Sequence, residues 1–423
     1  MQNFLWGKVV FFLVAVVAIL QVVHLILLSQ LEAKHRLRSK HDRQEDEFAP
    51  LRNEGETLFA VLVRSLTQSS LLDASGEYQV VPNLAPASRQ PQRSPAAGAV
   101  ADITLVTQCS VNHLHHLVAL AQRWQGPISV SVFVDDHEMF DALRGVATLR
   151  YCYSAVHHNV SFHLVSPLSA GGRPLFSVPP DSLSRCDLSA LASAPGRHNY
   201  AGRRRFPANL LRNVARRAAA SELVLVADVD MLPSSGLRQD FYDFAMRSHI
   251  FGSTQNEDKT VWVVPAFESQ ETVPTPQTKA ELLKLLDQGD VRPFYIELCW
   301  KCQVHTDYDA WQREPPSVGV VPLFEVLWKD PWEPFYITRN SAPFYDERFK
   351  QYGFNRISQV CELHVAGYKF SVLNNAFLVH RGLKTARSFH DGKDADQERN
   401  RVLFRQFKVE LRDRYPESSR RCY

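Results

Sequence analysis

The sequence predicts an α/β domain in which a parallel sheet is covered by helices on both faces. From residue 102 onward, short apolar runs alternate with runs whose apolar residues have helical spacing. This alternation is typical of parallel strands joined by helices. One apolar run, 223–227, ends on two aspartates, and open α/β sheets bind ligands at strand ends of this kind. With 423 residues, 45% of them hydrophobic, the chain can bury one large core or two medium ones.

Five elements are expected in the first part of this domain. Strands are predicted at 103–109, 128–136 and 160–166, and helices at 111–124 and 137–146. The strand runs are mostly apolar, as expected for strands buried on both faces. The helix runs place apolar residues three or four positions apart.

The pattern then breaks and resumes. The Gly-, Pro- and Ser-rich stretch 166–202 is expected to form a long loop. A helix opened by Pro207 follows at 206–220, and the next strand is expected at 222–227. The last hundred or so residues mix many aromatics and prolines, and we predict no topology for them.

The N-terminus predicts a membrane anchor. Residues 9–28 form an apolar run interrupted only by Gln21 and His24. A helix of this length rises about 30 Å, the thickness of a bilayer's hydrocarbon core. A cleaved signal peptide is the alternative, but the run is longer than usual for one and no A-x-A-like site follows. We therefore expect a cytoplasmic tail at 1–8 and a retained single-pass anchor at 9–28.

Residues 29–100 are expected to be a stem that separates the anchor from a folded domain at 101–423. They are polar, with a charged stretch followed by a region rich in Pro, Ala and Ser. Such a segment buries little and behaves as an extended spacer. Within it, the run 58–72 could form a short helix.

Two signals disagree about which side of the membrane holds the folded domain. Only Lys8 precedes the span, whereas four Lys or Arg residues lie between 34 and 40, which would place the C-terminal side in the cytoplasm. Asn159 begins an N-glycosylation sequon, which is used only in the secretory lumen. Large domains can translocate despite flanking charge. We favour the lumen.

Cysteine count and net charge exclude some classes of function. The seven cysteines are odd in number, so one remains free or pairs between chains. Cys299 and Cys302 have CxxC spacing, but there is no second CxxC for a zinc site and no βαβ start for a redox motif. A structural disulfide or buried thiols are favoured there. The net charge of +3 gives no reason to expect nucleic-acid binding.

The two acids after the strand at 222–227 carry the chemistry. Asp228 and Asp230 follow directly, and paired carboxylates suit Mg²⁺ or Mn²⁺, which would bridge a diphosphate. Two other D-x-D triplets, 307–309 and 394–396, do not follow a buried strand. Sequence context therefore selects the first triplet.

Haloacid-dehalogenase-type phosphatases offer a rival interpretation, because they also carry D-x-D at a strand end. Their pattern continues D-x-D-x-[TV], whereas Leu232 occupies the fifth position here. Their motif also opens the domain, and this one lies well inside it. Both departures count against a phosphatase.

A family resemblance is carried by two long blocks. The stretches "FPANLLRNVARRAAASELVLVADVDMLPS" and "WEPFYITRNSAPFYDERFKQYGFNRISQVCELHVAGYKFSVLNNAFLVHRGLK" resemble glycosyltransferase family 49, and the similarity extends over most of 100–423. The resemblance implies a GT-A type nucleotide-diphospho-sugar transferase fold, Rossmann-like with a mixed sheet and helices on both faces. It also implies Mn²⁺, a UDP-glucuronate donor and a type II Golgi membrane protein with its catalytic domain in the lumen.

The product implied by the resemblance is glucuronate in β1,4 linkage on a β-linked xylose. The acceptor would be the xylose-terminated O-mannosyl glycan of alpha-dystroglycan. The disaccharide would prime extension by LARGE-type glycosyltransferases, which are therefore implied partners.

The resemblance also implies roles around the metal. Asp228 and Asp230 match the family's D-x-D, and His380 resembles the late histidine that completes metal coordination in such folds. Lys384 lies four residues further on, where a cation would neutralise the leaving UDP. The alternative for His380 is a satisfied core histidine beside the apolar "AFLV".

Donor contacts are expected from a helix and a strand end. Asn209, Arg212 and Asn213 share one face of the helix before the metal strand, where they contact either the donor or one another. Thr107 and Gln108 end the first strand, which usually meets uridine in such folds.

Inversion at the sugar requires a general base, and the donor's carboxylate requires a cation. Glu362 is the expected base, with Asp346 and Glu347 as competitors, unless Glu362 only pairs with a cation. The arginine run 203–205 is a candidate for the carboxylate, and a solvated face is the alternative.

Three other functions stay open at this point. One is N-acetylglucosamine transfer to lactosamine chains, because D-x-D sites do not specify their sugar. The others are the D-x-D phosphatase and a non-catalytic glycan-binding scaffold on the same fold. The combined presence of Asp228, Asp230, His380 and Lys384 favours catalysis over scaffolding.

Overall fold

The structure is a computed structural model that describes residues 55–89, 99–168, 186, 205–252, 259–385 and 392–422. Glu56–Tyr423 form one compact unit. The expected tail and anchor, and most of the loop 166–202, lie outside the described residues. Within the described ranges no helix is both long and apolar enough to cross a membrane.

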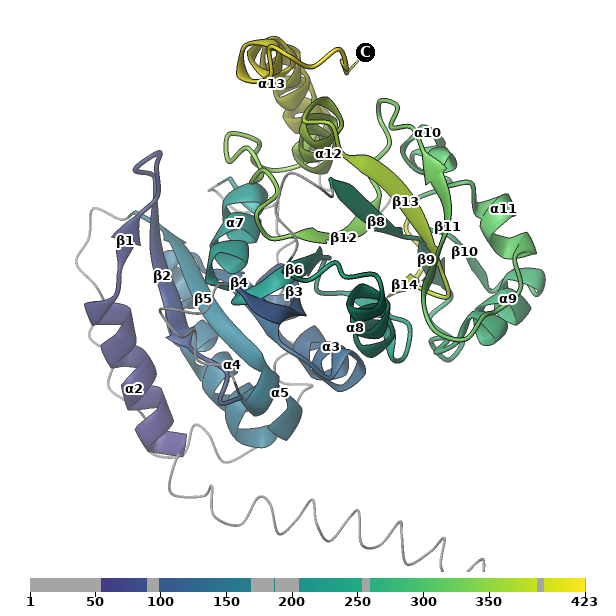
Figure 1. The fold of residues 1–423 in the computed structure, drawn as a ribbon. Coiled ribbons are helices and arrows are strands. Elements are labelled where there is room, and N and C mark those ends of the chain that lie inside the picture. The colour runs from purple at the N-terminus through teal and green to yellow at the C-terminus, as the bar shows by residue number, and fades with distance from the viewer. Residues whose placement is uncertain are drawn as a thin grey trace, which may run out of the picture. The chain divides into compact units, whose positions relative to one another are not determined.

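A ten-stranded mixed sheet forms the centre of this unit (Figure 1). In spatial order its strands are β1 (Leu71–Leu72), β2 (Tyr78–Ala85), β5 (Val160–Pro167), β4 (Ile128–Phe133), β3 (Val100–Ser110), β6 (Ser221–Val226), β12 (Phe335–Arg339), β8 (Thr260–Val264), β13 (Lys369–Asn374) and β11 (Val321–Val326). Strands β5, β4, β3 and β6 run parallel, as the sequence predicts. Strand β12 is antiparallel to both β6 and β8, which makes the whole sheet mixed.

Helices cover both faces of the sheet. Those in the described residues are α2 (Gly55–Gln68), α3 (His116–Trp124), α4 (Met139–Cys152), α5 (Ser154–Asn159), α7 (Ala208–Ala218), α8 (Leu237–Arg247), α9 (Lys279–Asp287), α10 (Trp300–Gln303), α11 (Tyr308–Arg313), α12 (Asn355–Val365) and α13 (Lys393–Arg414). Along β6, Leu223 and Leu225 join the core that holds α3, α4 and α8. Val224 and Val226 face the opposite way, toward Ala215 of α7. This alternation places α7 and α3 on opposite faces of the sheet.

The predicted stem is wrong for residues 55–89. Helix α2 lies within this stretch, and Phe59 and Leu62 are buried in the main core. Strand β2 pairs antiparallel with β5 and so extends the sheet. Polar composition masked an amphipathic helix and the strands β1 and β2. The apolar faces of α2 and β2 are recognised only once the sheet that they pack in is known. The expectation of a short helix in 58–72 is confirmed.

A second, four-stranded sheet brings distant parts of the chain together. Its strands are β10 (Val291–Pro293), β9 (Ala266–Ser269), β14 (Leu378–Arg381) and β7 (Met231–Pro233), in that order. Strand β7 begins directly after Asp230, and in the register of the sheet His380 on β14 lies opposite Met231. On its other side His380 lies beside Glu268 of β9. This sheet therefore sets the late histidine next to the D-x-D.

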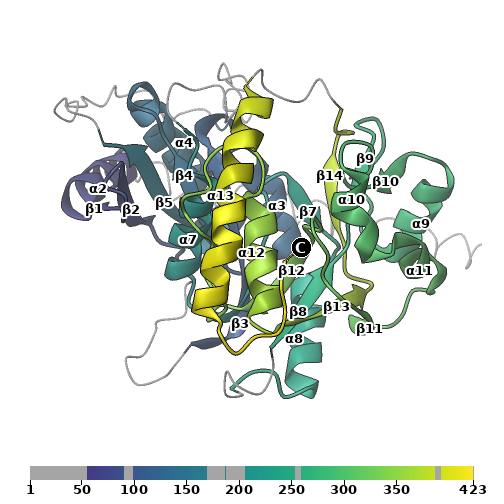
Figure 2. The same cartoon turned by 90° about the horizontal axis from the view of Figure 1, so that it is seen from above.

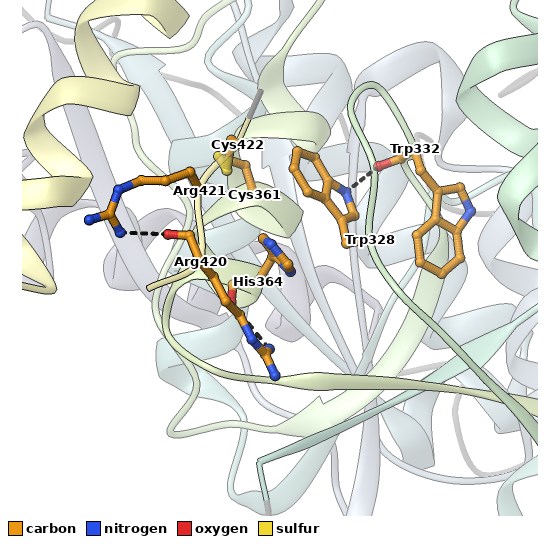
Figure 3. The surroundings of a disulfide bond; sticks show 7 residues. All are labelled: Trp328, Trp332, Cys361, His364, Arg420, Arg421 and Cys422. Carbon is orange, nitrogen blue, oxygen red and sulfur yellow. Dashed lines mark hydrogen bonds between the residues drawn. A yellow bond between two sulfur atoms is a disulfide. The ribbon is translucent and has the colours of Figure 1, made fainter. Parts of the chain in front are cut away.

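The C-terminal segment is fastened to α12. Figure 2 shows α13 lying along α12, and a disulfide between Cys361 and Cys422 joins the end of the chain to that helix. Beside the disulfide, Arg420 donates hydrogen bonds to the carbonyls of Tyr368 and His364 at 2.7 and 3.4 Å. Figure 3 shows Arg420 and His364 next to the two cysteines. The chain end thus restrains α12.

The remaining cysteines resolve the odd count. Cys299 and Cys302 form a disulfide, which confirms the structural interpretation of the CxxC spacing. Cys152 pairs with Cys186, and Cys109 is free and buried in the core.

The docking of α2 predicts a stability effect from a residue expected in the stem. Phe59→Ala should lower the free energy of unfolding by about 3 kcal/mol, because it empties a fully buried position. Denaturant titration measures this. Val61→Ala on the same helix is the matched control, since Val61 is 47% exposed and its loss should change stability by less than about 0.5 kcal/mol. Equal effects of the two substitutions would contradict the docking of α2.

Candidate active site

The two aspartates lie in the turn between β6 and β7, at the carboxyl end of the parallel strands. Their side chains are 29% and 27% exposed, so both are partly sheltered but reachable from solvent. The turn is held by two backbone bonds, from the Ala227 N–H to the carbonyl of Val106 and from the Met231 N–H to the carbonyl of Asp228. The two carboxylates have different partners, and the site divides accordingly.

Asp230 faces a histidine and a lysine. Nε2 of His380 lies 3.0 Å from Oδ2 of Asp230, and Nζ of Lys384 lies 3.6 Å from the same oxygen. Burial acts to raise the pKa of Asp230. The hydrogen bond and charge of His380, together with Lys384 and His116, outweigh burial and hold that pKa well below its usual range. Asp230 is therefore ionised at neutral pH.

The Asp230–His380 pair fits a divalent cation. Nδ1 of His380 lies 2.7 Å from the carbonyl of Gly382, and since a carbonyl only accepts, Nδ1 must donate. In the neutral ring, Nε2 then presents a lone pair to a carboxylate, so either a proton or a cation must lie between them. Two adjacent ligands of an octahedral cation with bonds of about 2.1 Å are about 3.0 Å apart. The fixed Nδ1 is the usual support for a metal-binding histidine.

Asp228 is held by cations rather than by further metal ligands. Nη2 of Arg356 donates to its Oδ2 at 2.6 Å, and Nη2 of Arg212 donates to its Oδ1 at 3.3 Å. Nε2 of Gln108 also donates to Oδ1 at 3.3 Å. Across the described residues, no group of three or more His, Cys, Asp or Glu side chains is arranged to hold a metal ion. The expected three-ligand set of Asp228, Asp230 and His380 is therefore assembled only in its Asp230–His380 part.

Of the expected donor-binding residues on α7, two hold the fold. Asn209 is fully buried, and its Nδ2 donates to the backbone carbonyls of Asp346 and Asn355. Asn213 donates to the carbonyl of Tyr345 and accepts from its N–H. For these two residues the helix-surface network is the observed arrangement. Only Arg212, whose Nη1 donates to Oδ1 of Asn209, reaches the D-x-D.

Thr107 and Gln108 lie at the end of β3, beside the D-x-D turn. Both are buried, and within the described structure Oγ1 of Thr107 and Oε1 of Gln108 have no hydrogen-bond partner. Buried polar atoms left in this state cost free energy unless something pairs with them.

The structure pairs Glu362 with the C-terminal segment. Its carboxylate accepts hydrogen bonds from Arg414 at 2.6 Å and from the hydroxyl of Tyr415 at 2.9 Å, on the side of α12 that meets α13. Glu362 is 2% exposed, so this is a buried ion pair that fastens the C-terminal helix. The structure shows the alternative interpretation of Glu362, pairing with a cation. A long-range contact of this kind leaves no trace in local sequence.

The competitors for the general base are also engaged. Asp346 pairs with Arg348, and Glu347 accepts from Asn213 and from Arg217. Of the arginine run 203–205, only Arg205 is described, and it is exposed.

Residues of the other two D-x-D triplets, 307–309 and 394–396, cap or pair within nearby helices. Asp307 caps α11 by accepting from the N–H of Ala310. Asp394 lies exposed in the first turn of α13, where an acid favours the helix dipole, and Asp396 pairs with Arg399. The choice of the first triplet on sequence context agrees with these positions.

Sequence reasoning missed Arg356 and a buried ion pair behind Lys384. Oε1 of Glu268 accepts from Arg292 at 2.6 Å, and Glu268 is fully buried. Its Oε2 accepts from the backbone N–H of Lys384 at 3.2 Å, while Arg292 donates to the Lys384 carbonyl at 3.2 Å. The pair thus holds the Lys384 backbone at both ends. Glu268 could have been suspected as an acid inside the apolar run "VWVVPAFES".

Two further titratable groups stand near the site. Burial lowers the pKa of His116 to about 4, reinforced by His115 and opposed by Asp230. Burial also raises the pKa of Glu333, which feels the charges of Arg356 and Asp228. Neither was predicted to lie here.

The mixed α/β sheet and the carboxylates at the end of β6 are those of a glycosyltransferase. The chain belongs to the family described as "Glycosyl-transferase for dystroglycan", whose sequence model matches residues 102–416. Membership of this family makes the protein a glycosyltransferase and excludes the phosphatase and the non-catalytic scaffold.

Curated relatives cover nearly the whole chain. It is 38% identical to beta-1,4-glucuronyltransferase 1 of Danio rerio over 98% of each chain. It is 40% identical to beta-1,4-glucuronyltransferase 1 of Homo sapiens over 89% of this chain and 88% of the relative. The human xylosyl- and glucuronyltransferase LARGE1 is 30% identical over 75% of this chain, which spans only 35% of LARGE1.

Among solved structures, S. aureus TarS 1–349 in complex with UDP aligns with 66% of this chain. The alignment covers 60% of the TarS chain, at 14% identity and a TM-score of 0.33. With identity and TM-score this low, the similarity gives no information about the site.

The Glu268–Arg292 pair predicts a measurable effect on catalysis. Glu268→Gln should lower kcat/KM for the nucleotide sugar by about 10-fold, because supporting groups behind ligands and cations usually contribute that much. Steady-state release of the nucleotide diphosphate measures it. Glu297 also pairs with Arg292 but its side chain is 63% exposed, so Glu297→Gln is the matched control and should leave kcat/KM unchanged. An unchanged Glu268→Gln enzyme would show that Lys384 needs no such support.

Proposed function

We propose that this chain transfers glucuronate from UDP-glucuronate to a β-linked xylose, forming a β1,4 bond in a metal-dependent, inverting reaction. The observation that most supports this proposal is that His380 and Lys384 both lie beside Asp230, an arrangement suited to a cation and a diphosphate. The identity of the donor is supported by the relatives, which are named as glucuronyltransferases. A GT-A type fold is supported by the parallel strands β5, β4, β3 and β6 with D-x-D at the end of β6.

In this proposal the residues act as follows. Asp230 and His380 hold Mn²⁺, which when bound supplies positive charge to the diphosphate of the donor. Lys384 adds a cation beside Asp230 and neutralises the leaving UDP. Asp228 fixes the guanidinium groups of Arg212 and Arg356 at the other half of the site.

Inversion follows from the linkages. UDP-glucuronate is α-linked and the product is β-linked, so the acceptor hydroxyl attacks in a single displacement from the opposite side. That step needs a base for the hydroxyl proton. The pairing of Glu362 with Arg414 and Tyr415 removes Glu362 from this role in the proposal.

The acceptor in the proposal is the xylose-terminated O-mannosyl glycan of alpha-dystroglycan, whose extension by LARGE-type enzymes would follow. It is supported by the family's description, which names dystroglycan, and by the similarity to LARGE1. Transfer of N-acetylglucosamine to lactosamine chains is the competing proposal, and the donor decides between them.

We place the protein in the Golgi membrane with its catalytic domain in the lumen. The three disulfides support this location, because disulfides persist in oxidising compartments and are rare in the cytosol. The sequon residue Asn159 ends α5 and is partly exposed.

The first test of the proposal is UDP release by the purified chain with a β-xyloside acceptor. With Mn²⁺ present, the enzyme should release UDP from UDP-glucuronate but not from UDP-N-acetylglucosamine. With EDTA in place of Mn²⁺, it should release no UDP from either donor. Asp230→Asn should reduce turnover on the order of 100-fold, because it removes a charge at the diphosphate. Asp394→Asn alters an exposed aspartate of another D-x-D triplet and should retain full activity.

Each contrary result has a distinct meaning. Turnover of UDP-N-acetylglucosamine alone would show that this sugar, and not glucuronate, is the one transferred. Full activity in EDTA would show that the reaction needs no metal ion. Equal activity of the Asp230→Asn and Asp394→Asn variants would remove Asp230 from the mechanism.

Lumenal placement predicts a glycan on Asn159. Treatment of the cell-expressed chain with peptide-N-glycosidase should increase its gel mobility, and Asn159→Gln should abolish that shift because Asn159 carries the sequon. A protease-protection assay on intact vesicles provides the independent readout. Cleavage of the catalytic domain in unpermeabilised vesicles would place it in the cytoplasm.

A further inference from the structure

The Asp228 half of the site brings two guanidinium groups to one carboxylate. Arg212 from α7 and Arg356 from the start of α12 both bind the single carboxylate of Asp228, at 3.3 and 2.6 Å. Their side chains are only 6% and 13% exposed, so the charges are partly removed from water. Among the described residues, Asp228 is the one carboxylate that accepts hydrogen bonds from these two guanidinium groups, while the charge of Glu333 also acts on both. A bound anion would be a second hydrogen-bond partner for them.

The guanidinium group of Arg356 uses only one of its N–H donors within the described residues. Within the part of the chain that the structure describes, its side chain donates one hydrogen bond, from Nη2 to Asp228. Its Cζ lies 4.0 Å from the ring centroid of Phe335, so the ring supports the flat face of the guanidinium. A planar group of five N–H donors that uses one of them retains a fork that matches a second carboxylate.

The position of Arg356 is fixed from behind. It is the second residue of α12, whose later turns are fastened by the Cys361–Cys422 disulfide and the Glu362–Arg414 pair. A guanidinium held in place before its ligand arrives loses less conformational entropy on binding.

The donor proposed above has two anionic parts, a diphosphate and a sugar carboxylate. In the proposed function the diphosphate would meet Lys384 and the metal ion that Asp230 and His380 would hold. The guanidinium groups lie at the other carboxylate of the D-x-D, and a bidentate fork suits a planar carboxylate. The two halves of the site therefore divide the two anionic parts between them.

We propose that Arg356, with Arg212 beside it, binds the sugar carboxylate of the donor and so selects a uronate over a neutral hexose. This inference rests on the proposed function, since it requires a UDP-sugar donor at this site. It replaces the arginine run 203–205 as the predicted carboxylate partner.

Binding measurements on the full-length chain separate the two anions. Calorimetric titration in Mn²⁺ would compare UDP, UDP-glucose and UDP-glucuronate. UDP-glucose carries a hydroxymethyl group where UDP-glucuronate carries the carboxylate. Arg356→Gln should lower the affinity for UDP-glucuronate by about 10- to 100-fold, as expected for loss of charge-assisted hydrogen bonds. UDP and UDP-glucose should change by less than about 3-fold, since neither carries the carboxylate that Arg356 binds.

Two further variants complete the design. Arg348 pairs with Asp346 and Glu410 on the surface, so Arg348→Gln is the matched control and should leave all three affinities unchanged. Arg356→Lys keeps the charge without the fork and should recover only part of the preference for UDP-glucuronate. This variant also tests the proposal if Arg356→Gln does not fold.

The outcomes are distinguishable. Equal weakening of all three ligands by Arg356→Gln would assign Arg356 to the diphosphate and overturn the inference. Unchanged preference for UDP-glucuronate in both Arg356 variants would overturn it as well. If the unaltered chain binds UDP-glucuronate no better than UDP-glucose, the proposed donor itself fails, independently of Arg356.

Discussion

The arrangement of the site depends on the backbone pairing of β14 between β7 and β9. This small sheet lies outside the main sheet and draws together segments about 150 residues apart in sequence, as the separation between Asp230 and His380 shows. Strand pairing fixes register, and a slip of one residue would turn His380 to the opposite face. The contact of His380 with Asp230 is therefore a consequence of backbone hydrogen bonding before it is a matter of side-chain chemistry.

Charge is distributed unequally over the D-x-D. Asp230 meets an imidazole and an ammonium group, whereas Asp228 meets two guanidinium groups. Both carboxylates are kept ionised against the effect of burial, which by itself would raise their pKa. A buried strand can end in two acids here because each acid organises a different set of cations in a partly sheltered site.

Helix α12 links the site to the end of the chain. Its first turn presents Arg356 to Asp228, and its later turns are held by Arg414, Tyr415 and the disulfide to Cys422. The carboxylate of Glu362 faces α13 and the guanidinium of Arg356 faces the D-x-D. One helix therefore serves both the stability of the C-terminus and the geometry of the site. Elsewhere in the sheet, strand β2 pairs with the edge of β5, and helix α2 packs in the same core as β5.

The sequence by itself determined the alternating strands and helices of 103–227 and the position of the D-x-D, because hydrophobic periodicity and a strand's end are local properties. The family resemblance added His380 and Lys384, which the structure does bring to Asp230. Only tertiary structure decided that Glu362 binds Arg414, that Asn209 and Asn213 support a loop, and that Arg356 reaches Asp228. Each of these contacts joins residues far apart in the chain, and a side chain's partner is set by how the elements pack, which no local pattern encodes.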